Sequence, residues 1–250
     1  KVYKKFGIEF PLLFKYIDAN DDLSVQVHPS DELSKKRHNA YGKTEMWYVI
    51  HAEEGALINS GFNRQLTREQ YLEYLESGRL NEILHYDEVK PGDVFFIPAG
   101  RVHAIGKGVV LAEIQETSDV TYRIYDYNRK DANGNLRELH NDLALDAIDF
   151  SYLDEYKTKY TVEVNKSSEI VSCEYFTTSL LTFTEKLEKD YHQLDSFVVY
   201  MNLDGRFSIE FEAGEETIEK GETVLIPANL ETYRLNPLTP EVKTLEVYIK

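Results

Sequence analysis

Cysteine and methionine are scarce in this 250-residue sequence, and long apolar runs are missing. The one cysteine, Cys173, cannot form a disulfide within the chain, which is typical of an intracellular, cytoplasmic protein. No apolar stretch approaches the ~20 residues that cross a bilayer. The charged start Lys1–Phe10 does not resemble a signal peptide. The chain begins with Lys and almost directly with a strand-like run, so we expect that an N-terminal piece is missing.

Basic residues are also in deficit. The sequence has 28 Lys and Arg against 44 Asp and Glu, a formal charge of −16. So acidic a surface argues against nucleic-acid or membrane partners. An anionic ligand would need a local basic cluster. The composition does not determine the oligomeric state.

Aromatic and β-branched residues are plentiful, with 18 Tyr and 12 Phe, and they favour sheet over helix. Short apolar or alternating runs between turn signals predict a β-sandwich or β-barrel. Strands are expected at Phe10–Ile17, Leu23–Val27, Met46–Ile50, Ala56–Phe62, Val94–Ile97, Val109–Glu116, Thr121–Asp126, Cys173–Phe183, Phe197–Leu203, Phe207–Glu212, Thr223–Ile226 and Thr244–Ile249.

One segment, at about residues 63–85, has a helical pattern. It carries a capping box over Thr67–Gln70 and a broken apolar face, and Gly78 is expected to separate two short helices. A weaker helix or an irregular linker is expected around Leu143–Tyr156. Few large apolar residues follow it, which predicts one domain over residues 1–156 and another over 157–250.

An internal repeat underlies this division. Lys90–Gly100 resembles Lys220–Asn229 at an offset of 129, and Met46–Gly55 resembles Ser196–Gly205 at an offset of 150. The difference of 21 residues matches the helical insertion. The sequence therefore predicts two related β-barrel units, of which the first carries the insertion.

Several residues of the first unit suit a metal site. Alternation places Gln26 with His28 on one strand face and Lys43 with Glu45 on another, and His103 follows a third strand. Imidazole and carboxylate ligands suit Zn, Fe or Mn, and a mixed set with an open position suits catalysis.

A strand histidine is more often a hydrogen-bonded surface or core residue, and this is our interpretation of five others: His38, His51, His85, His140 and His192. For His28 and His103 the repeat favours a metal site. The second copy keeps the strand pattern but does not keep the residue types of the candidate ligands. The repeat aligns Glu45 with Asp195, His103 with Thr232, Gln26 with Phe176 and His28 with Thr178.

Two further positions carry charge within strand-like runs. Glu113 shares a strand face with Gln115, and Arg123 lies between β-type residues. From periodicity alone, a surface salt bridge and a functional role are equally good readings of Arg123.

Four sequence motifs together are specific enough to indicate a protein family. They are Gln26–Pro29 (QVHP), Gly42–Tyr48 (GKTEMWY), Gly92–Ile105 (GDVFFIPAGRVHAI) and Gln115–Tyr127 (QETSDVTYRIYDY). In this order and spacing they resemble type I mannose-6-phosphate isomerases of the short bacterial form, in the cupin superfamily. The resemblance covers essentially the whole chain, although family members usually carry several dozen residues before the segment matching Phe10–Asp18.

The resemblance implies a mainly β fold of two tandem cupin-type jelly-roll barrels, the second degenerate and without ligands. It implies zinc-dependent interconversion of mannose 6-phosphate and fructose 6-phosphate. The family's ligands for one Zn²⁺ fall on His28, Glu45 and His103, with Gln26 as the fourth. Its active-site arginine falls on Arg123, and the match places Lys43 and Glu113 in the same pocket.

Such an isomerisation moves a proton between C2 and C1 through an enediol, which requires a base and a grip on the phosphate. Glu113 and a metal-activated water are both candidate proton carriers. The expected phosphate contacts are Lys43, Arg101, Lys107 and Arg123. The alternatives are a non-catalytic sugar-phosphate-binding cupin, another metal-dependent cupin enzyme and a purely structural two-barrel protein.

Overall fold

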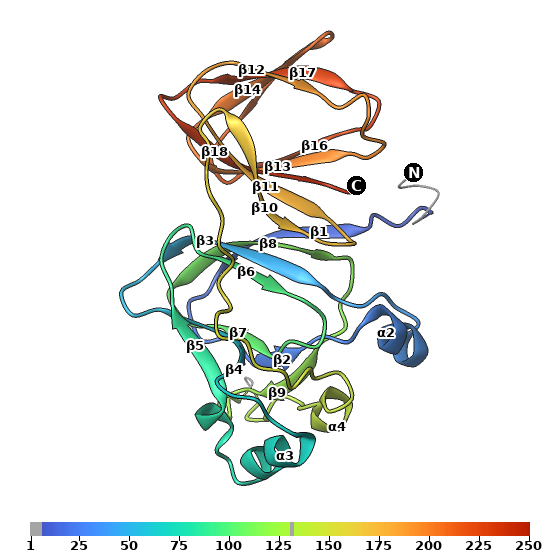
Figure 1. The fold of residues 1–250 in the computed structure, drawn as a ribbon, viewed down its shortest axis with the longest axis vertical. Coiled ribbons are helices and arrows are strands. Elements are labelled where there is room, and N and C mark those ends of the chain that lie inside the picture. The colour runs from blue at the N-terminus through green and yellow to red at the C-terminus, as the bar shows by residue number, and fades with distance from the viewer. Residues whose placement is uncertain (1–6, 131–132) are drawn as a thin grey trace. The chain divides into compact units, whose positions relative to one another are not determined.

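The computed structural model describes residues 7–130 and 133–250 (Figure 1). The chain divides into two compact units. The first unit is residues 12–157, and the second is residues 158–250 together with residues 7–11. Within the described residues, the α-helices all belong to the first unit. None of the described helices is long and apolar enough to cross a bilayer.

The first unit contains two antiparallel sheets, ordered β1-β8-β3-β6 and β5-β4-β7-β2-β9. The strands of the first sheet are β1 (Leu12–Asp18), β8 (Val109–Glu116), β3 (Glu45–Ala52) and β6 (Val94–Ile97). Those of the second are β5 (Leu84–Glu88), β4 (Leu57–Phe62), β7 (His103–Ile105), β2 (Val25–Val27) and β9 (Tyr122–Tyr125). The helices are α2 (Asp31–His38), α3 (Arg68–Glu76), the 3₁₀ helix η1 (Leu80–Glu82) and α4 (Asn141–Ala144).

Two apolar clusters bury both faces of the second sheet. Trp47 and Phe95 of the first sheet pack with Ile58 and Ile105 between the sheets. On the outer face, Val25 and Val27 join a cluster that includes Tyr71 of α3 and Ala144 of α4. A side chain of β2 or β7 therefore points either into the space between the sheets or against the helical layer.

The predicted capping box begins α3. The Thr67 hydroxyl accepts from the Gln70 N–H at 3.3 Å, and the Gln70 side chain accepts from the Thr67 N–H at 2.9 Å. Gly78 adopts a left-handed φ of 71°, and η1 follows it. The prediction of two short helices separated by Gly78 is confirmed.

The second unit is also built from two antiparallel sheets, ordered β10-β11-β18-β13-β16 and β12-β17-β14-β15. Its strands are β10 (Lys166–Ser172), β11 (Thr177–Phe183), β12 (Leu187–Asp190), β13 (Val198–Asp204), β14 (Phe207–Phe211), β15 (Gly214–Ile218), β16 (Thr223–Ile226), β17 (Thr232–Pro237) and β18 (Val242–Tyr248). The mainly β prediction is confirmed, and every predicted strand overlaps an observed one. Closed barrels are not confirmed, because in the described residues all four sheets are open.

The segment Leu143–Tyr156 agrees with the irregular-linker alternative, because it holds only the end of α4 (Asn141–Ala144) and is otherwise irregular. Other elements do not follow the predictions. Helix α2 was not expected, although Ser30 is its N-cap and accepts from the Leu33 N–H at 3.4 Å. Six strands of the described residues were also missed: β5, β7, β10, β12, β15 and β17. In β10 and β12, Lys, Glu and Ser weaken the apolar alternation.

The two units repeat the same strand order. The ladder β1-β8-β3-β6 corresponds to β11-β18-β13-β16, and β5-β4-β7-β2 to β15-β14-β17-β12. The repeated loop keeps its hydrogen bonds, since the Gly92 N–H donates to Val49 O and the Gly221 N–H to Asn202 O, each at 2.8 Å. Both glycines have a left-handed φ, which disfavours other residues there. The structure thus confirms the repeat.

Strand register corrects the alignment predicted for the candidate ligands. Glu45 pairs with Ile97, and the repeat-equivalent Ile226 pairs with Val198, so Val198 rather than Asp195 replaces Glu45. Phe176 and Thr178 were also wrong as counterparts of Gln26 and His28. Thr178 lies on β11, which corresponds to β1 rather than β2, and Phe176 immediately precedes it.

The inward faces of β7 and β17 correct the alignment of His103. Ile58 pairs with Ile105, and Ile209 pairs with Leu235. When Ile58 is equated with Ile209, their partners Ile105 and Leu235 are equivalent. Two residues earlier on β7 and β17, His103 is then equivalent to Tyr233 rather than to Thr232. The pairs Gln26–His103 and Lys189–Tyr233 then equate Gln26 with Lys189. A fixed sequence offset fails here because strand faces alternate with each residue.

A hydrogen-bonded network fills the place in the second unit that corresponds to the candidate site. The buried Glu246 carboxylate accepts from Lys189 Nζ at 2.6 Å, from Ser167 at 2.8 Å and from the Tyr191 hydroxyl. Tyr200 links Tyr191 to Tyr233 through hydroxyl contacts of 3.2 and 2.9 Å. Because Lys189 lies on β12 and Glu246 on β18, their ion pair joins the two sheets.

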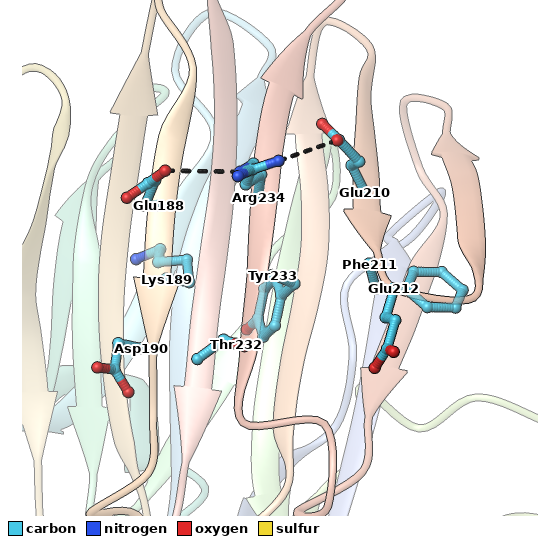
Figure 2. Close-up of a pocket in the computed structure, with 9 residues that line it drawn as sticks. All are labelled: Glu188, Lys189, Asp190, Glu210, Phe211, Glu212, Thr232, Tyr233 and Arg234. Carbon is cyan, nitrogen blue, oxygen red and sulfur yellow. Dashed lines mark hydrogen bonds and ion pairs between the residues drawn. The ribbon is translucent and has the colours of Figure 1, made fainter.

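A pocket of about 590 Å³ is lined by residues of β12, β14 and β17 and by Glu212 (Figure 2). Arg234 projects there between Glu188 at 3.5 Å and Glu210 at 3.1 Å. These side chains are 38–81% exposed and pair with one another, so we assign them to surface ion pairing.

Replacing Lys189 with Met should lower the free energy of unfolding by about 3 kcal/mol, because the Glu246 carboxylate stays buried without its cation. The double variant Lys189→Met/Glu246→Met should recover much of this loss. The matched control is Lys186→Met, whose ion pair with Glu210 is exposed, and it should change stability by less than about 1 kcal/mol. Chemical denaturation followed by circular dichroism measures all three. Equal losses for Lys189→Met and Lys186→Met would contradict the assignment.

Candidate active site

Three strand segments of the first unit bring the predicted ligands together. Gln26 lies on β2, and His28 follows two residues later on the same face. Glu45 is the first residue of β3 and His103 is the first of β7. Gln26 and His103 are direct partners in the ladder between β2 and β7.

His28, Glu45 and His103 form a buried group whose ligand atoms lie within 4.8 Å of one another. The Nε2 atom of His103 is 3.4 Å from Glu45 Oε1, and that of His28 is 3.6 Å from Glu45 Oε2. Two ligands of a tetrahedral ion, each about 2.1 Å from it, are about 3.4 Å apart. The spacing therefore fits a metal ion.

The backbone fixes which nitrogen each imidazole presents. His28 Nδ1 lies 3.1 Å from Val120 O, and His103 Nδ1 lies 2.8 Å from Arg101 O. A carbonyl only accepts, so both Nδ1 atoms carry the proton and both Nε2 lone pairs face Glu45. Burial lowers the pKa of His103 to about 3 and that of His28 well below its ordinary value. Both rings are therefore neutral near pH 7, as metal ligands must be.

The environment of the Glu45 carboxylate also fits a metal ligand. Burial, followed by the nearby charge of Glu113, raises the pKa of Glu45 to about 7. Its Oε1 atom is buried and has no hydrogen-bond partner among the residues that the structure describes. An orphaned carboxylate oxygen that faces two imidazole lone pairs fits a divalent cation. Gln26 Nε2 lies 3.2 Å from His103 Nε2, so the amide borders the same space.

Lys43 and Glu113 lie beside this group. Lys43 Nζ is 2.6 Å from Glu45 Oε2 and 3.1 Å from His28 Nε2. Burial alone would lower the pKa of Lys43, but Glu45 and Glu113 outweigh it and raise that pKa. Lys43 is therefore a buried ammonium that contacts two of the candidate ligands.

Sequence reasoning missed two residues that hold Glu113. Lys15 Nζ donates to Glu113 Oε1 at 2.8 Å, and Trp47 Nε1 donates to Glu113 Oε2 at 2.9 Å. Burial alone would raise the pKa of Glu113, but Lys43 and Lys15 outweigh it and lower that pKa. Lys15 interrupts an otherwise apolar run, a signal that could have identified it.

A cavity of about 510 Å³ is lined in part by Gln26, whose amide nitrogen lies 3.2 Å from His103 Nε2. Arg123 lies on β9 directly opposite Gln26 and lines this cavity. Arg129 and Arg137, which the sequence analysis did not select, also line it.

The structure places Arg101 and Lys107 outside the residues that line this cavity. The Arg101 guanidinium donates to Phe96 O at 2.8 Å and lies 5.2 Å from the centre of the Tyr156 ring. Lys107 lies in a turn, where its N–H donates to Asp22.

Comparison with known proteins places the chain in a family. Residues 1–54 match the model of the type I phosphomannose isomerase catalytic domain, and residues 166–238 match that of the mannose-6-phosphate isomerase cupin domain. Mannose-6-phosphate isomerase ManA of Bacillus subtilis is 37% identical over 232 residues, 92% of this chain and 73% of the relative. The chain belongs to the type I mannose-6-phosphate isomerase family.

Further relatives agree with this membership and with the predicted resemblance. Mannose-6-phosphate isomerase of Streptococcus mutans is 32% identical, over 91% of this chain and 71% of its own length. The crystal structure of mannose 6-phosphate isomerase from Bacillus subtilis aligns with a TM-score of 0.87 and 30% identity. That alignment covers all of this chain and 81% of the other. The chain is thus a member of an enzyme family.

Glu116 anchors the strand between Lys43 and Glu45. Its Oε2 accepts from the Thr44 N–H at 2.7 Å, and its own N–H donates to Thr44 O at 3.1 Å. Burial, with a further contribution from Asp31, raises the pKa of Glu116 to about 7. The folded state therefore favours a protonated carboxyl at this position.

A raised carboxyl pKa is a stability effect that depends on pH. Between about pH 4.5 and 7 the folded chain binds the extra proton, so this group's contribution to stability falls as the pH rises through that window. Glu116→Gln keeps an acceptor and removes the ionisation. The free energy of unfolding of this variant should equal that of the parent near pH 4.5. Above pH 7 it should exceed the parent's value by roughly 1–3 kcal/mol. Denaturation curves at several pH values test this, with the exposed Glu216→Gln as control. A pH-independent difference would contradict it.

Proposed function

We propose that the chain interconverts mannose 6-phosphate and fructose 6-phosphate. The observation that carries this proposal is the buried His28–Glu45–His103 group, with Lys43 and Glu113 beside it and the neighbouring Gln26 lining a cavity. Relatives that share more than two thirds of their length with the chain are named mannose-6-phosphate isomerases. Such sugar phosphates occur in the cytoplasm, where we place the enzyme.

We further propose one Zn²⁺ per chain, held by His28, Glu45 and His103 with Gln26 as the fourth ligand. A bound zinc ion would supply Lewis-acid polarisation of the substrate's oxygens. Lys43 lies within hydrogen-bond distance of two of these ligands, so its ammonium competes for the same lone pairs. Lys43 is therefore expected to move away from His28 in the metal-loaded protein, towards the substrate.

The proposed chemistry is proton transfer between C2 and C1 of the sugar through an enediol. A carboxylate that stays ionised can accept the proton, and Glu113 is held in that state by Lys15 and Lys43. The same carboxyl then returns the proton to the neighbouring carbon. Arg123 is too weak an acid to act as an ordinary base, so its proposed role is to stabilise negative charge on the substrate.

The fold fits the same proposal. We propose that both units are cupin-type jelly rolls in tandem, the first (residues 1–156) catalytic with the insertion at about 63–85, and the second (157–250) degenerate. The shared strand order and the repeated glycine loop support this assignment. The tyrosine network in the second unit accounts for its lack of ligands.

The enzyme should form fructose 6-phosphate from mannose 6-phosphate, lose activity with a chelator and regain it with zinc. His103→Ala should lower both bound zinc and turnover at least about tenfold, since loss of a ligand weakens the metal site. A coupled assay and metal analysis measure these effects. His51→Ala, an exposed histidine on the same strand as Glu45, is the control. Full zinc content in His103→Ala would contradict the ligand assignment, and an inactive zinc-loaded enzyme would contradict the isomerase.

Lys15→Met should raise the pKa of Glu113, because it removes a positive charge 2.8 Å from the carboxylate. The acid limb of the kcat/KM profile should then move to higher pH. Lys15→Arg, which keeps the charge, should restore the limb towards its original position. A profile that falls uniformly at every pH, without this shift, would contradict the proposed role of Glu113.

A further inference from the structure

We propose that Trp47, the one tryptophan of the sequence, is a positioning residue that fixes the Glu113 carboxylate relative to the candidate metal ligand His103. This inference rests on the proposed function and deepens it, because it explains what holds the proposed proton carrier in place beside the ligand group. Trp47 acts through these two neighbours and is not assigned a contact with the sugar.

The first observation is the place of Trp47 in its sheet. It lies on β3 two residues after Glu45, so the two side chains share the face of β3 that is turned towards the other sheet of the first unit. Strand β3 lies between β8 and β6, and Trp47 pairs with Glu113 on one side and with Phe95 on the other. Its side chain is fully buried. Close packing on both sides therefore leaves the indole ring little freedom to move.

The second observation is a direct hydrogen bond to the proposed proton carrier. Trp47 Nε1 donates to Glu113 Oε2 at 2.9 Å, and Lys15 Nζ donates to Glu113 Oε1 at 2.8 Å. An indole has a single N–H whose direction the ring fixes, whereas an ammonium has three hydrogens on a flexible stem. The Lys15 side chain is also 38% exposed. Lys15 therefore supplies charge, and Trp47 orients the carboxylate. Each carboxylate oxygen keeps a further lone pair, so Glu113 can still accept a proton.

The third observation is the contact of the same ring with a candidate ligand. The Trp47 and His103 rings meet edge to face, with centroids 5.3 Å apart and an interplanar angle of 80°. His103 is also held by the hydrogen bond between its Nδ1 atom and Arg101 O, at 2.8 Å. One rigid side chain therefore touches both the residue that would carry the proton and a residue that would hold the metal.

The second unit shows which part of this arrangement belongs to the fold. The position equivalent to Trp47 there is Tyr200, which pairs with Glu246 across β13 and β18. Its hydroxyl lies 2.9 Å from that of Tyr233, the counterpart of the histidine on β7. An aromatic ring at this position is thus common to both copies, and packing accounts for it. Tyr200 is linked to Glu246 through the Tyr191 hydroxyl, whereas the Trp47 N–H reaches its carboxylate directly. The direct hydrogen bond belongs to the copy that has the candidate ligands.

The proposed isomerisation makes the position of Glu113 important. Its carboxylate must approach C2 and then C1 while the ligand group holds the sugar, and proton transfer needs the heavy atoms at hydrogen-bond distance. A displacement of about 1 Å in such a geometry can lower a rate by about 100-fold. We therefore expect the Trp47 N–H to affect the proton-transfer step more than substrate binding.

Two replacements test the N–H of Trp47. Trp47→Phe keeps an aromatic ring and removes the donor. Benzothienylalanine at position 47 has the shape of tryptophan with sulfur in place of the N–H, so it removes the donor without leaving a cavity. The matched control is Phe95→Leu, which removes volume from the same buried cluster and leaves the donor to Glu113 in place.

The measurements separate folding and metal content from catalysis. Circular dichroism and metal analysis first establish that each zinc-loaded full chain is folded and how much zinc it holds. Steady-state kinetics then give kcat and KM for mannose 6-phosphate and for the same sugar deuterated at C2.

Both replacements of Trp47 should hold as much zinc as the parent, and kcat should fall roughly tenfold or more while KM changes less than about threefold. The deuterium isotope effect on kcat should exceed that of the parent, because proton transfer becomes the slower step. Phe95→Leu should keep the parent's isotope effect, and its kcat should stay within about threefold of the parent's.

Four results would each overturn the inference. They are an unchanged kcat or a loss of zinc in the benzothienylalanine protein, a loss of kcat without a larger isotope effect, and an equally enlarged isotope effect in Phe95→Leu. A parent enzyme that holds zinc but does not isomerise mannose 6-phosphate would instead contradict the proposed function, and the inference with it. An active parent whose turnover does not depend on the Trp47 N–H contradicts the inference alone.

Discussion

The Glu45 carboxylate is the group on which the first unit's chemistry depends. It is fully buried, and an isolated buried charge is unstable unless cations or donors surround it. Lys43, His28 and His103 all converge on it, and the backbone fixes both imidazoles in the tautomer that turns a lone pair towards it. Within the described residues, its Oε1 atom still accepts no hydrogen bond. The interior is thus arranged around a negative charge that the protein alone satisfies only in part.

The second unit shows how the same ladder of strands resolves this problem differently. Strand register places Val198 at the position of Glu45 and Tyr233 at the position of His103. The second unit therefore has neither the central carboxylate nor this imidazole. The carboxylate that remains, Glu246, faces Tyr200 just as Glu113 faces Trp47. Lys189 supplies its cation directly. A duplicated scaffold can therefore carry a site in one copy and a self-contained polar core in the other.

Much of the site could be predicted from the sequence because its signals are local. Alternation along a strand predicts that Gln26 and His28 share a face. The capping box of α3 consists of four consecutive residues. The missing information was long-range. Lys15 meets Glu113 only through the pairing of β1 with β8, and Arg129 and Arg137 meet through Asp126 after a left-handed turn. The misaligned counterparts of Glu45 and His103 have the same origin, because an offset in sequence does not record which way a strand faces.

The ion pair between Lys189 and Glu246 makes the charge balance of the second unit independent of metal supply. An ammonium group is part of the polypeptide and is present from the moment of synthesis, whereas a metal ion must be acquired from a supply that rises and falls. The buried Glu246 carboxylate therefore has a cation without any acquired component. If the first unit holds the proposed metal ion, scarcity of metal would affect the buried group of the first unit and leave the Lys189–Glu246 pair of the second unchanged.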